Sequence, residues 1–445
     1  MAFIPTLLAS TAVSAADLNL VIDETVEEQP AGYALGVTAG VVVLDLPSFA
    51  APVFVDGDVD FDGENDPLAV GGLFGLSAST VVGHHGDSAV SVGISGFLAL
   101  GSGSTNNTQT LSGEGSVIIS GLSTPTGVIT LETDPATPSA ESDISGTTEG
   151  VDQNVFVSGG GTINAWGAEQ DLPGDSFSLA GAQTDAVAGA AAAWGAIASE
   201  EGGVFVGVGD LDGLEITTDV RNEFLYGGAD LTVALSNAAG EGVALQGYVG
   251  PSYRFLGQRG TTTITVDIPE MEPVAPAGYE FPTYGQETVE TLNTHYLGGV
   301  LGGSMTTLLT DNMTFTLGLE GGAYYANTHY SGEESYSLTG GDPALTLGDQ
   351  TVENAVEVVD TDHGLALAVR GHAALTTAIS ANQQLTFGAG VEYLSRVATV
   401  DRELGGTVTP GAGDITYAGP ASGSSLLTFG DMWGFSGSIS FTGQF

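Results

Sequence analysis

Seven charged or titratable residues lie on runs of the chain that otherwise alternate between apolar and small residues. Arg370 and Glu392 occur on two such runs, 364–379 and 384–397, which are joined by a short turn. If these runs pair as a hairpin, Glu392 falls opposite either Arg370 or His372. Such a group can fill an interior with ion pairs, or it can form a charged constriction that sets ion selectivity. The candidates are Asp230, Arg254, Glu320, Arg370, His372, Glu392 and Arg396.

A second candidate site is the acidic segment 56–66. Acidic residues at alternate positions followed by Gly63 are similar to the beginning of a calcium-binding loop. The twelfth position is Ala69, which has no carboxylate, so a complete EF-hand is not predicted. A weak Ca²⁺ site and a solvated acidic loop both remain open. The candidate ligands are Asp58, Asp60, Asp62 and Glu64.

Catalytic chemistry has less support in the sequence. His329 and His363 flank one long connection, with Ser331 and Asp360 nearby, but nothing in the sequence fixes their mutual geometry. The chain has no Cys, and it contains no phosphate-binding loop, zinc-binding helix motif or nucleophile elbow. We therefore expect that the protein is not an enzyme.

Composition excludes several classes of protein. The chain of 445 residues has 54 acidic residues against 6 Lys and Arg, which gives a formal charge of −48. Such a chain repels phosphate backbones, so nucleic-acid binding is excluded. No apolar stretch reaches the ~18 residues that a transmembrane helix needs. Mean hydropathy is nevertheless +0.21, and 68 residues are Gly, so the chain is apolar but lacks helical membrane spans.

The elements that would position these residues are strands with a period of two. In the run 33–45, Tyr33, Leu35 and Val37 share a face, whereas Ala34 and Gly36 lie on the other. Small residues on one face and large apolar residues on the other suit a barrel in lipid rather than a soluble sheet. The ten runs with this pattern are 33–45, 68–82, 89–101, 223–236, 243–256, 295–309, 313–328, 364–379, 384–397 and 432–445.

The connections alternate between short and long, as in an up-and-down barrel with tight turns on one side of the membrane. Four aromatic residues, Tyr253, Tyr325, Tyr393 and Trp433, fall at a similar distance from the short turns. They predict an aromatic girdle near the outer surface of the membrane.

The segment 101–221 is harder to interpret. We expect 101–175 to be a long external excursion. The Ala-rich segment 185–199 fits a helix that plugs the lumen, or one strand of a hairpin that continues to 218. The hairpin would raise the strand count from ten to twelve, and we favour twelve.

Together these features resemble a Gram-negative outer-membrane β-barrel protein of porin-like type. Residues 1–15 read as an export signal, although no basic residue precedes the apolar run, and 16–32 as a periplasmic segment before a single barrel over 33–445. The last strand alternates apolar residues and ends in Phe445, which in that family is the signal read by the outer-membrane assembly machinery.

We therefore predict an all-β, antiparallel, up-and-down transmembrane barrel with long acidic extracellular loops, embedded in the lipid bilayer of the outer membrane. The expected function is passive passage of small solutes or cations through a narrow lumen that contains the seven candidates. The alternative is a structural surface protein with a plugged lumen, whose acidic loops bind Ca²⁺ or neighbouring molecules. No cofactor is required by either.

Overall fold

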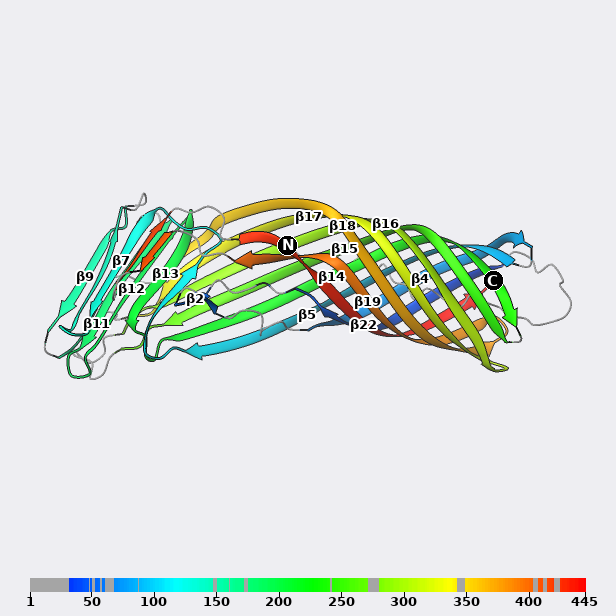
Figure 1. Cartoon of the computed structure of the whole chain (residues 1–445), viewed down its shortest axis with the longest axis horizontal. Coiled ribbons are helices and arrows are strands. Elements are labelled where there is room, and N and C mark those ends of the chain that lie inside the picture. The colour runs from blue at the N-terminus through cyan, green and yellow to red at the C-terminus, as the bar shows by residue number, and fades with distance from the viewer. Residues whose placement is uncertain are drawn as a thin grey trace.

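A computed structural model describes residues 32–445 with short gaps, and it contains a barrel at one end and a stack of smaller sheets at the other (Figure 1). The gaps are 48, 50–52, 57, 61–67, 87, 147–149, 160, 172–174, 241, 271–279, 342–348, 403–406, 411–413 and 420–424. The export signal and the periplasmic segment predicted for 1–15 and 16–32 lie outside the described residues, apart from Gly32. No helix in the described part of the chain is long and apolar enough to cross a membrane.

The barrel is closed, antiparallel and built from ten strands, each of which pairs with its neighbours in the chain's up-and-down order. All ten predicted runs are barrel strands, which confirms the all-β barrel. The preferred count of twelve is wrong, and the alternative of ten is correct. The strands are β1 (Tyr33–Asp45), β4 (Ala69–His85), β5 (Ser88–Thr110), β14 (Glu215–Gly240), β15 (Val243–Asp267), β16 (Thr283–Thr310), β17 (Met313–Thr339), β18 (Gln350–Ser380), β19 (Gln383–Arg402) and β22 (Ser425–Gln444).

The large apolar side chains of the barrel point outward. In β18, Leu365 and Leu367 are 82% and 59% exposed, whereas Ala366 between them is buried. Because side chains alternate across a strand, every second residue faces outward in the part of each strand that carries the apolar band. An exterior that carries this much exposed apolar surface is suited to hydrocarbon and not to water.

The first and last strands close the barrel. β1 pairs with β22 over twelve residue pairs, and the backbones of Tyr33 and Phe445 exchange two hydrogen bonds of 3.0 and 2.9 Å. Thr38 and Ser440 add a hydrogen bond between side chains inside the barrel, 2.6 Å long. The chain's terminal residue is therefore part of the seam.

Six strands, β5 and β14 to β18, continue well beyond the apolar band. β14 and β15 remain paired as far as Glu215 and Asp267, and β16 and β17 as far as Thr283 and Thr339. β1 and β4 end much earlier, so only one side of the barrel continues outward. In Figure 1 these long strands lead from the barrel to the smaller sheets.

Two further sheets form a cap on this extended wall. The seven-stranded sheet has the order β10-β11-β12-β13-β6-β2-β3, and the five-stranded sheet has the order β20-β21-β7-β8-β9. The strands of the first are β2 (Val53–Val55), β3 (Asp58–Asp60), β6 (Glu114–Ser120), β10 (Thr162–Gln170), β11 (Ser176–Asp185), β12 (Ala190–Ser199) and β13 (Gly202–Asp210). Those of the second are β7 (Gly127–Asp134), β8 (Ser139–Ser145), β9 (Gln153–Ser158), β20 (Thr407–Pro410) and β21 (Asp414–Gly419).

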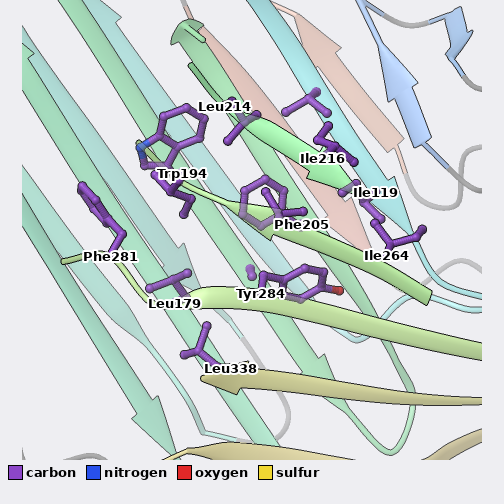
Figure 2. Packing of buried hydrophobic residues seen from close by; sticks show 14 of the residues in the cluster. Ile119, Leu179, Trp194, Phe205, Leu214, Ile216, Ile264, Phe281, Tyr284 and Leu338 are labelled. Atoms are coloured by element: carbon purple, nitrogen blue, oxygen red, sulfur yellow. The ribbon is translucent and has the colours of Figure 1, made fainter. Parts of the chain in front are cut away.

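The seven-stranded sheet is buried on both faces. On one face, Trp194 and Phe205 pack against Tyr284 and Ile264 of the extended barrel wall (Figure 2). On the other face, Ala193 and Val206 belong to a cluster with residues of the five-stranded sheet. The wall and the two sheets thus form three layers with two apolar cores between them.

One buried carboxylate fastens the cap to the wall. Glu334 of β17 accepts a hydrogen bond of 2.6 Å from the backbone N–H of Leu122 in the cap, and one from the Tyr336 hydroxyl. Its other oxygen accepts hydrogen bonds from Thr288 and Gln286 of β16 at 2.9 and 3.2 Å. A buried charge is tolerable here because both of its oxygens have donors.

These layers correct the interpretation of segment 101–221. Residues 185–199 contain neither a plug helix nor a membrane strand, because β12 lies in the middle of the cap. The alternative of a hairpin is correct in part, because β12 and β13 pair through a turn at residues 200–201, but this hairpin belongs to the cap. The predicted excursion 101–175 also has different bounds: β5 continues in the barrel wall to Thr110, and the cap segment returns to the barrel at Glu215.

Candidate functional site

Five of the seven candidates form one ion-pair network inside the barrel. Arg254 of β15 grips Asp230 of β14 with two hydrogen bonds of 2.7 and 3.0 Å. Its guanidinium also lies 3.7 Å from Glu320 of β17, and Arg370 of β18 lies 3.6 Å from the same carboxylate. Arg370 and Glu392 are directly opposite in the β18–β19 pairing, with nitrogen and oxygen 3.0 Å apart. Negative and positive side chains therefore alternate along the network, which follows about half of the barrel's circumference.

Aromatic side chains on the opposite wall of the barrel contact the ion-pair network across the lumen. The Tyr226 hydroxyl of β14 donates to Glu392 of β19 at 2.8 Å, and these strands lie five places apart in the ring of ten. The Arg370 guanidinium lies 5.5 Å from the ring centre of Phe97 in β5, which is also on the far side. Tyr248 donates to Glu320 at 3.0 Å. The barrel is thus narrow enough at this height for opposite walls to touch.

Sequence reasoning missed these aromatic partners. Tyr226 and Tyr248 lie on the inward face by the same alternation that placed the charged residues, and a search for inward aromatic residues would have found them. The pairing of opposite walls could not have been found, because the alternation gives a residue's face and not its distance across the lumen.

An apolar layer lies at the level of the network and on its cap side. Every barrel strand contributes at least one buried side chain to a single contiguous cluster. Tyr296 and Tyr324 meet edge-on within it, with ring centres 6.4 Å apart. The full set is Val42, Leu44, Ala69, Phe97, Ala99, Phe224, Tyr226, Leu256, Tyr296, Val300, Tyr324, Ala326, Ala366, Ala368, Leu394, Val397 and Met432.

Small cavities remain on the other side of the network, toward the short turns. One is lined by hydroxyls and small residues of β1, β19 and β22, including Ser438 and Thr386, with Arg370 and His372 at its upper end. The second is lined by Ser77, Ser95 and Gln246, with Asp230 and Glu320 among its polar groups. His372 lies over Gly318 of β17, where no larger residue would fit. The larger of these two cavities also touches Phe97 and Tyr226, so it reaches from the short-turn side of the lumen to the level of the apolar layer.

Arg396 does not belong to the lumen network, contrary to the sequence prediction. The β19–β22 register shifts between Ser395 and Val397, and Arg396 adopts a left-handed φ of 57° at this bulge. A bulge adds one residue to a strand and resets which face follows, so simple alternation fails there. The Arg396 guanidinium instead pairs with Asp362 of β18 at 2.7 Å and lies 3.9 Å from the Phe429 ring centre.

The same bulge marks the place where β18 and β19 separate. Their pairing ends at Ala368 and Leu394, although both strands continue outward. Beyond it, carbonyls of β19 accept hydrogen bonds from lumen-facing side chains: Ala398 from Gln258 at 2.8 Å, and Arg396 from Tyr296 at 3.2 Å. The outer part of β19 thus leans inward beside the apolar layer.

The calcium candidates are only partly described. Asp58 and Asp60 are the two ends of β3, at the edge of the seven-stranded sheet, and Asp62 and Glu64 lie outside the described residues. Among described residues, no group of three or more His, Cys, Asp and Glu side chains is arranged to hold a metal ion. The Ca²⁺ site remains a proposal.

The rim histidines lie outside the barrel and not at its mouth. His329 and His363 point outward from β17 and β18, and both are exposed. They do not face a common cavity with Ser331 and Asp360 among the pockets that the structure defines.

No protein-family model matches this chain, and no curated protein matches it. Solved structures do match. The outer-membrane protease OmpT from Escherichia coli is 10% identical, covers 95% of this chain and 99% of its own, and has a TM-score of 0.31. A Pseudomonas aeruginosa FadL homologue is 8% identical over 93% and 90%, with a TM-score of 0.23. The P. putida toluene transporter TodX is 6% identical over 94% and 91%, with a TM-score of 0.21.

The fold resembles that of Gram-negative outer-membrane β-barrel proteins. The closed barrel, its exposed apolar exterior and its seam between first and last strand carry this conclusion. A closed barrel with an apolar exterior is the architecture of a transmembrane β-barrel.

The expectation that the protein is not an enzyme is corrected. The first of the similar structures is a protease, so the class of fold hosts catalysis as well as transport. At this low similarity no protease activity passes to the present chain. The absence of a recognisable sequence motif was too weak a reason to exclude catalysis.

Proposed function

We propose that this protein is an outer-membrane anchor that holds a rigid β-sheet cap above the membrane, with its lumen closed by side chains. The observation that carries the proposal is the apolar layer to which all ten strands contribute. Water and ions do not cross a continuous packed layer of buried apolar side chains, since their desolvation is unfavourable. The cap, packed on the barrel wall through a large core, is then the part that meets the cell's surroundings.

Conductance across planar bilayers tests this proposal. We expect the purified chain to insert without steady conductance above background. Truncating three aromatic residues of the layer together, Phe97→Ala, Tyr226→Ala and Tyr296→Ala, should create a water path and measurable channels. The matched control truncates three lipid-facing aromatic residues, Phe387→Ala, Phe435→Ala and Phe441→Ala, and should remain silent. Steady channels in the unaltered protein would contradict the proposal.

Passive passage of small solutes or cations is the second candidate. The cavities beside the network favour it, because they already hollow part of the lumen. In that case the unaltered protein conducts, and Arg370→Ala raises cation preference because Glu392 and Glu320 lose their partner. Reversal potentials under a KCl gradient measure that preference. In a closed barrel the same substitution lowers thermal stability and leaves conductance at background.

A further inference from the structure

The larger lumen cavity combines hydroxyl groups at one end with apolar side chains at the other. Toward the short turns it is lined by hydroxyls, among them those of Ser438 and Thr442. At the level of the ion-pair network it is lined by Leu44, Leu73 and Phe97. An apolar pocket on which a few polar groups converge is the usual form of a small-molecule site.

The cavity exists because β19 carries glycine where a side chain would fill the space. A Cβ atom at Gly388 would lie 2.9 Å from the Ser438 Oγ, and one at Gly390 would lie 2.8 Å from the Ser436 Oγ. The two hydroxyls of β22 therefore lean over the glycines with which they pair. The volume of the cavity, about 110 Å³, is of the order of the ~150 Å³ at which an apolar cavity in a protein binds benzene.

Several polar groups point into this cavity without a hydrogen-bond partner in the described part of the chain. Elsewhere in the lumen hydroxyls satisfy one another, as Thr376 and Thr386 do at 2.9 Å. A hydroxyl can both donate and accept, and a neutral imidazole has one nitrogen of each kind, so these groups suit a ligand hydroxyl or amide. The unpartnered side chains are Ser77, Ser436, Ser438 and His372.

The charged groups of the cavity, by contrast, are already paired. Arg370 lies 3.0 Å from Glu392 and 3.6 Å from Glu320, and the Tyr226 hydroxyl donates to Glu392 at 2.8 Å. An anionic ligand would meet these carboxylates and a cationic ligand would meet Arg370, and either would lose its hydration on entry. A neutral ligand avoids both costs.

We propose that this cavity binds a small neutral amphiphile. An apolar ring or short alkyl chain lies against Phe97 and Leu44, and one hydroxyl or amide group lies among Ser436, Ser438 and His372. Removal of the apolar part from water drives binding, and the hydrogen bonds fix the orientation. The ligand enters from the short-turn side, because the apolar layer lies at the other end of the cavity. This inference goes beyond the role of the cap, and it holds whether or not the lumen conducts.

Four probes of the same ring and similar size test the proposal by titration of the full chain in lipid nanodiscs, with empty nanodiscs as the blank. They are cyclohexanol, methylcyclohexane, cyclohexanecarboxylate and cyclohexylammonium. Cyclohexanol should bind about three- to tenfold more tightly than methylcyclohexane, and the two charged probes should bind more weakly than either. A variant with Ser436→Ala, Ser438→Ala and His372→Phe should lose the preference for cyclohexanol. The matched control is Ser91→Ala with Ser95→Ala in the second cavity, which should retain it.

Three results would overturn the proposal. The first is binding of cyclohexanol no greater than to empty nanodiscs, which would indicate a cavity that holds water only. The second is equal binding of cyclohexanol and methylcyclohexane, which would indicate that the polar groups take no part. The third is tighter binding of either charged probe. If the triple variant does not fold, Ala374→Leu, which fills the cavity and removes no polar group, must abolish cyclohexanol binding, or the proposal fails.

Discussion

The barrel and the cap use the same alternation of side chains with opposite consequences. In the membrane, large apolar residues such as Leu301 and Leu367 face outward and are mostly exposed, while the inward face is small or charged. In the cap, Trp194 and Val204 lie on opposite faces of one sheet and both are completely buried. The barrel is stabilised by lipid around it and by ion pairs within it, whereas the cap supplies its own apolar surroundings in three layers. The two regions should therefore respond to different substitutions.

The largest expected effect is in the cap core. Trp194→Ala removes a fully buried side chain that packs against Gly207 and the wall cluster, and should cost about 3–5 kcal/mol of cap stability. Proteolysis of the cap in urea measures this, while heat-modifiable migration on gels reports the barrel. The control is Trp433→Ala on the lipid face, where Trp433 is 47% exposed. Equal sensitivity of cap and barrel to Trp194→Ala would mean that they unfold as one unit.

The barrel counterpart is Arg254, which is 1% exposed and holds Asp230 by two hydrogen bonds. Arg254→Met leaves a buried carboxylate without its partner, and should cost about 3–5 kcal/mol. Adding Asp230→Asn removes the stranded charge and should recover a large part of the loss. Thermal unfolding of the barrel measures both variants. A double variant no more stable than the single one would show that shape, and not charge, decides the packing at this height.

The sequence was sufficient to predict the barrel strands but not the strands of the cap, and the reason is physical. A strand with lipid on one side keeps a period of two, and β1 shows large residues alternating with small ones from Tyr33 to Val41. β12 is buried on both faces, so its Ala-rich sequence lost the alternation and fitted a helix equally well. Arg396 was misplaced because no sequence feature announces a bulge at an arginine with positive φ. The inward position of Arg370, by contrast, could be predicted from the alternation of side chains alone.

Alkaline pH should lower the stability of the cap more than that of the barrel, and this effect should be smaller than those of the two substitutions above. Burial raises the pKa of Tyr284 and Tyr336 in the cap core well above the ordinary value, and the Glu334 carboxylate adds to the rise. Because the pKa of each tyrosine is raised in the folded state, its contribution to the free energy of unfolding is complete at pH values below the unfolded pKa near 10. That contribution declines as the pH rises above this value. Urea unfolding of the cap at pH 9 and pH 11 measures the decline. Tyr284→Phe should reduce the pH dependence, and an unchanged slope would contradict this assignment.

The smallest expected effect concerns calcium. If Asp58, Asp60 and Asp62 bind Ca²⁺ weakly beside the edge strand β3, millimolar calcium should raise the melting temperature of the cap by a few degrees at most, by linkage. Replacing all three with Asn should abolish the rise and leave the barrel unaffected. Magnesium at the same concentration is the control for ionic strength. A cap transition that is indifferent to calcium would remove this site.

The cap sheets recruit strands from both ends of the chain, and this has a consequence for the order of folding. β2 pairs with β6 after leaving the first barrel strand, and β21 pairs with β7 shortly before the last barrel strand begins. The seven-stranded sheet needs no strand beyond β13, but the five-stranded sheet is incomplete until β21 has been delivered, and contacts between residues so far apart in sequence form slowly. The cap therefore matures late, at about the time when β22 closes the seam with β1. A complete cap would then form only after strands β1 to β21 have been exported, at about the time when the barrel closes.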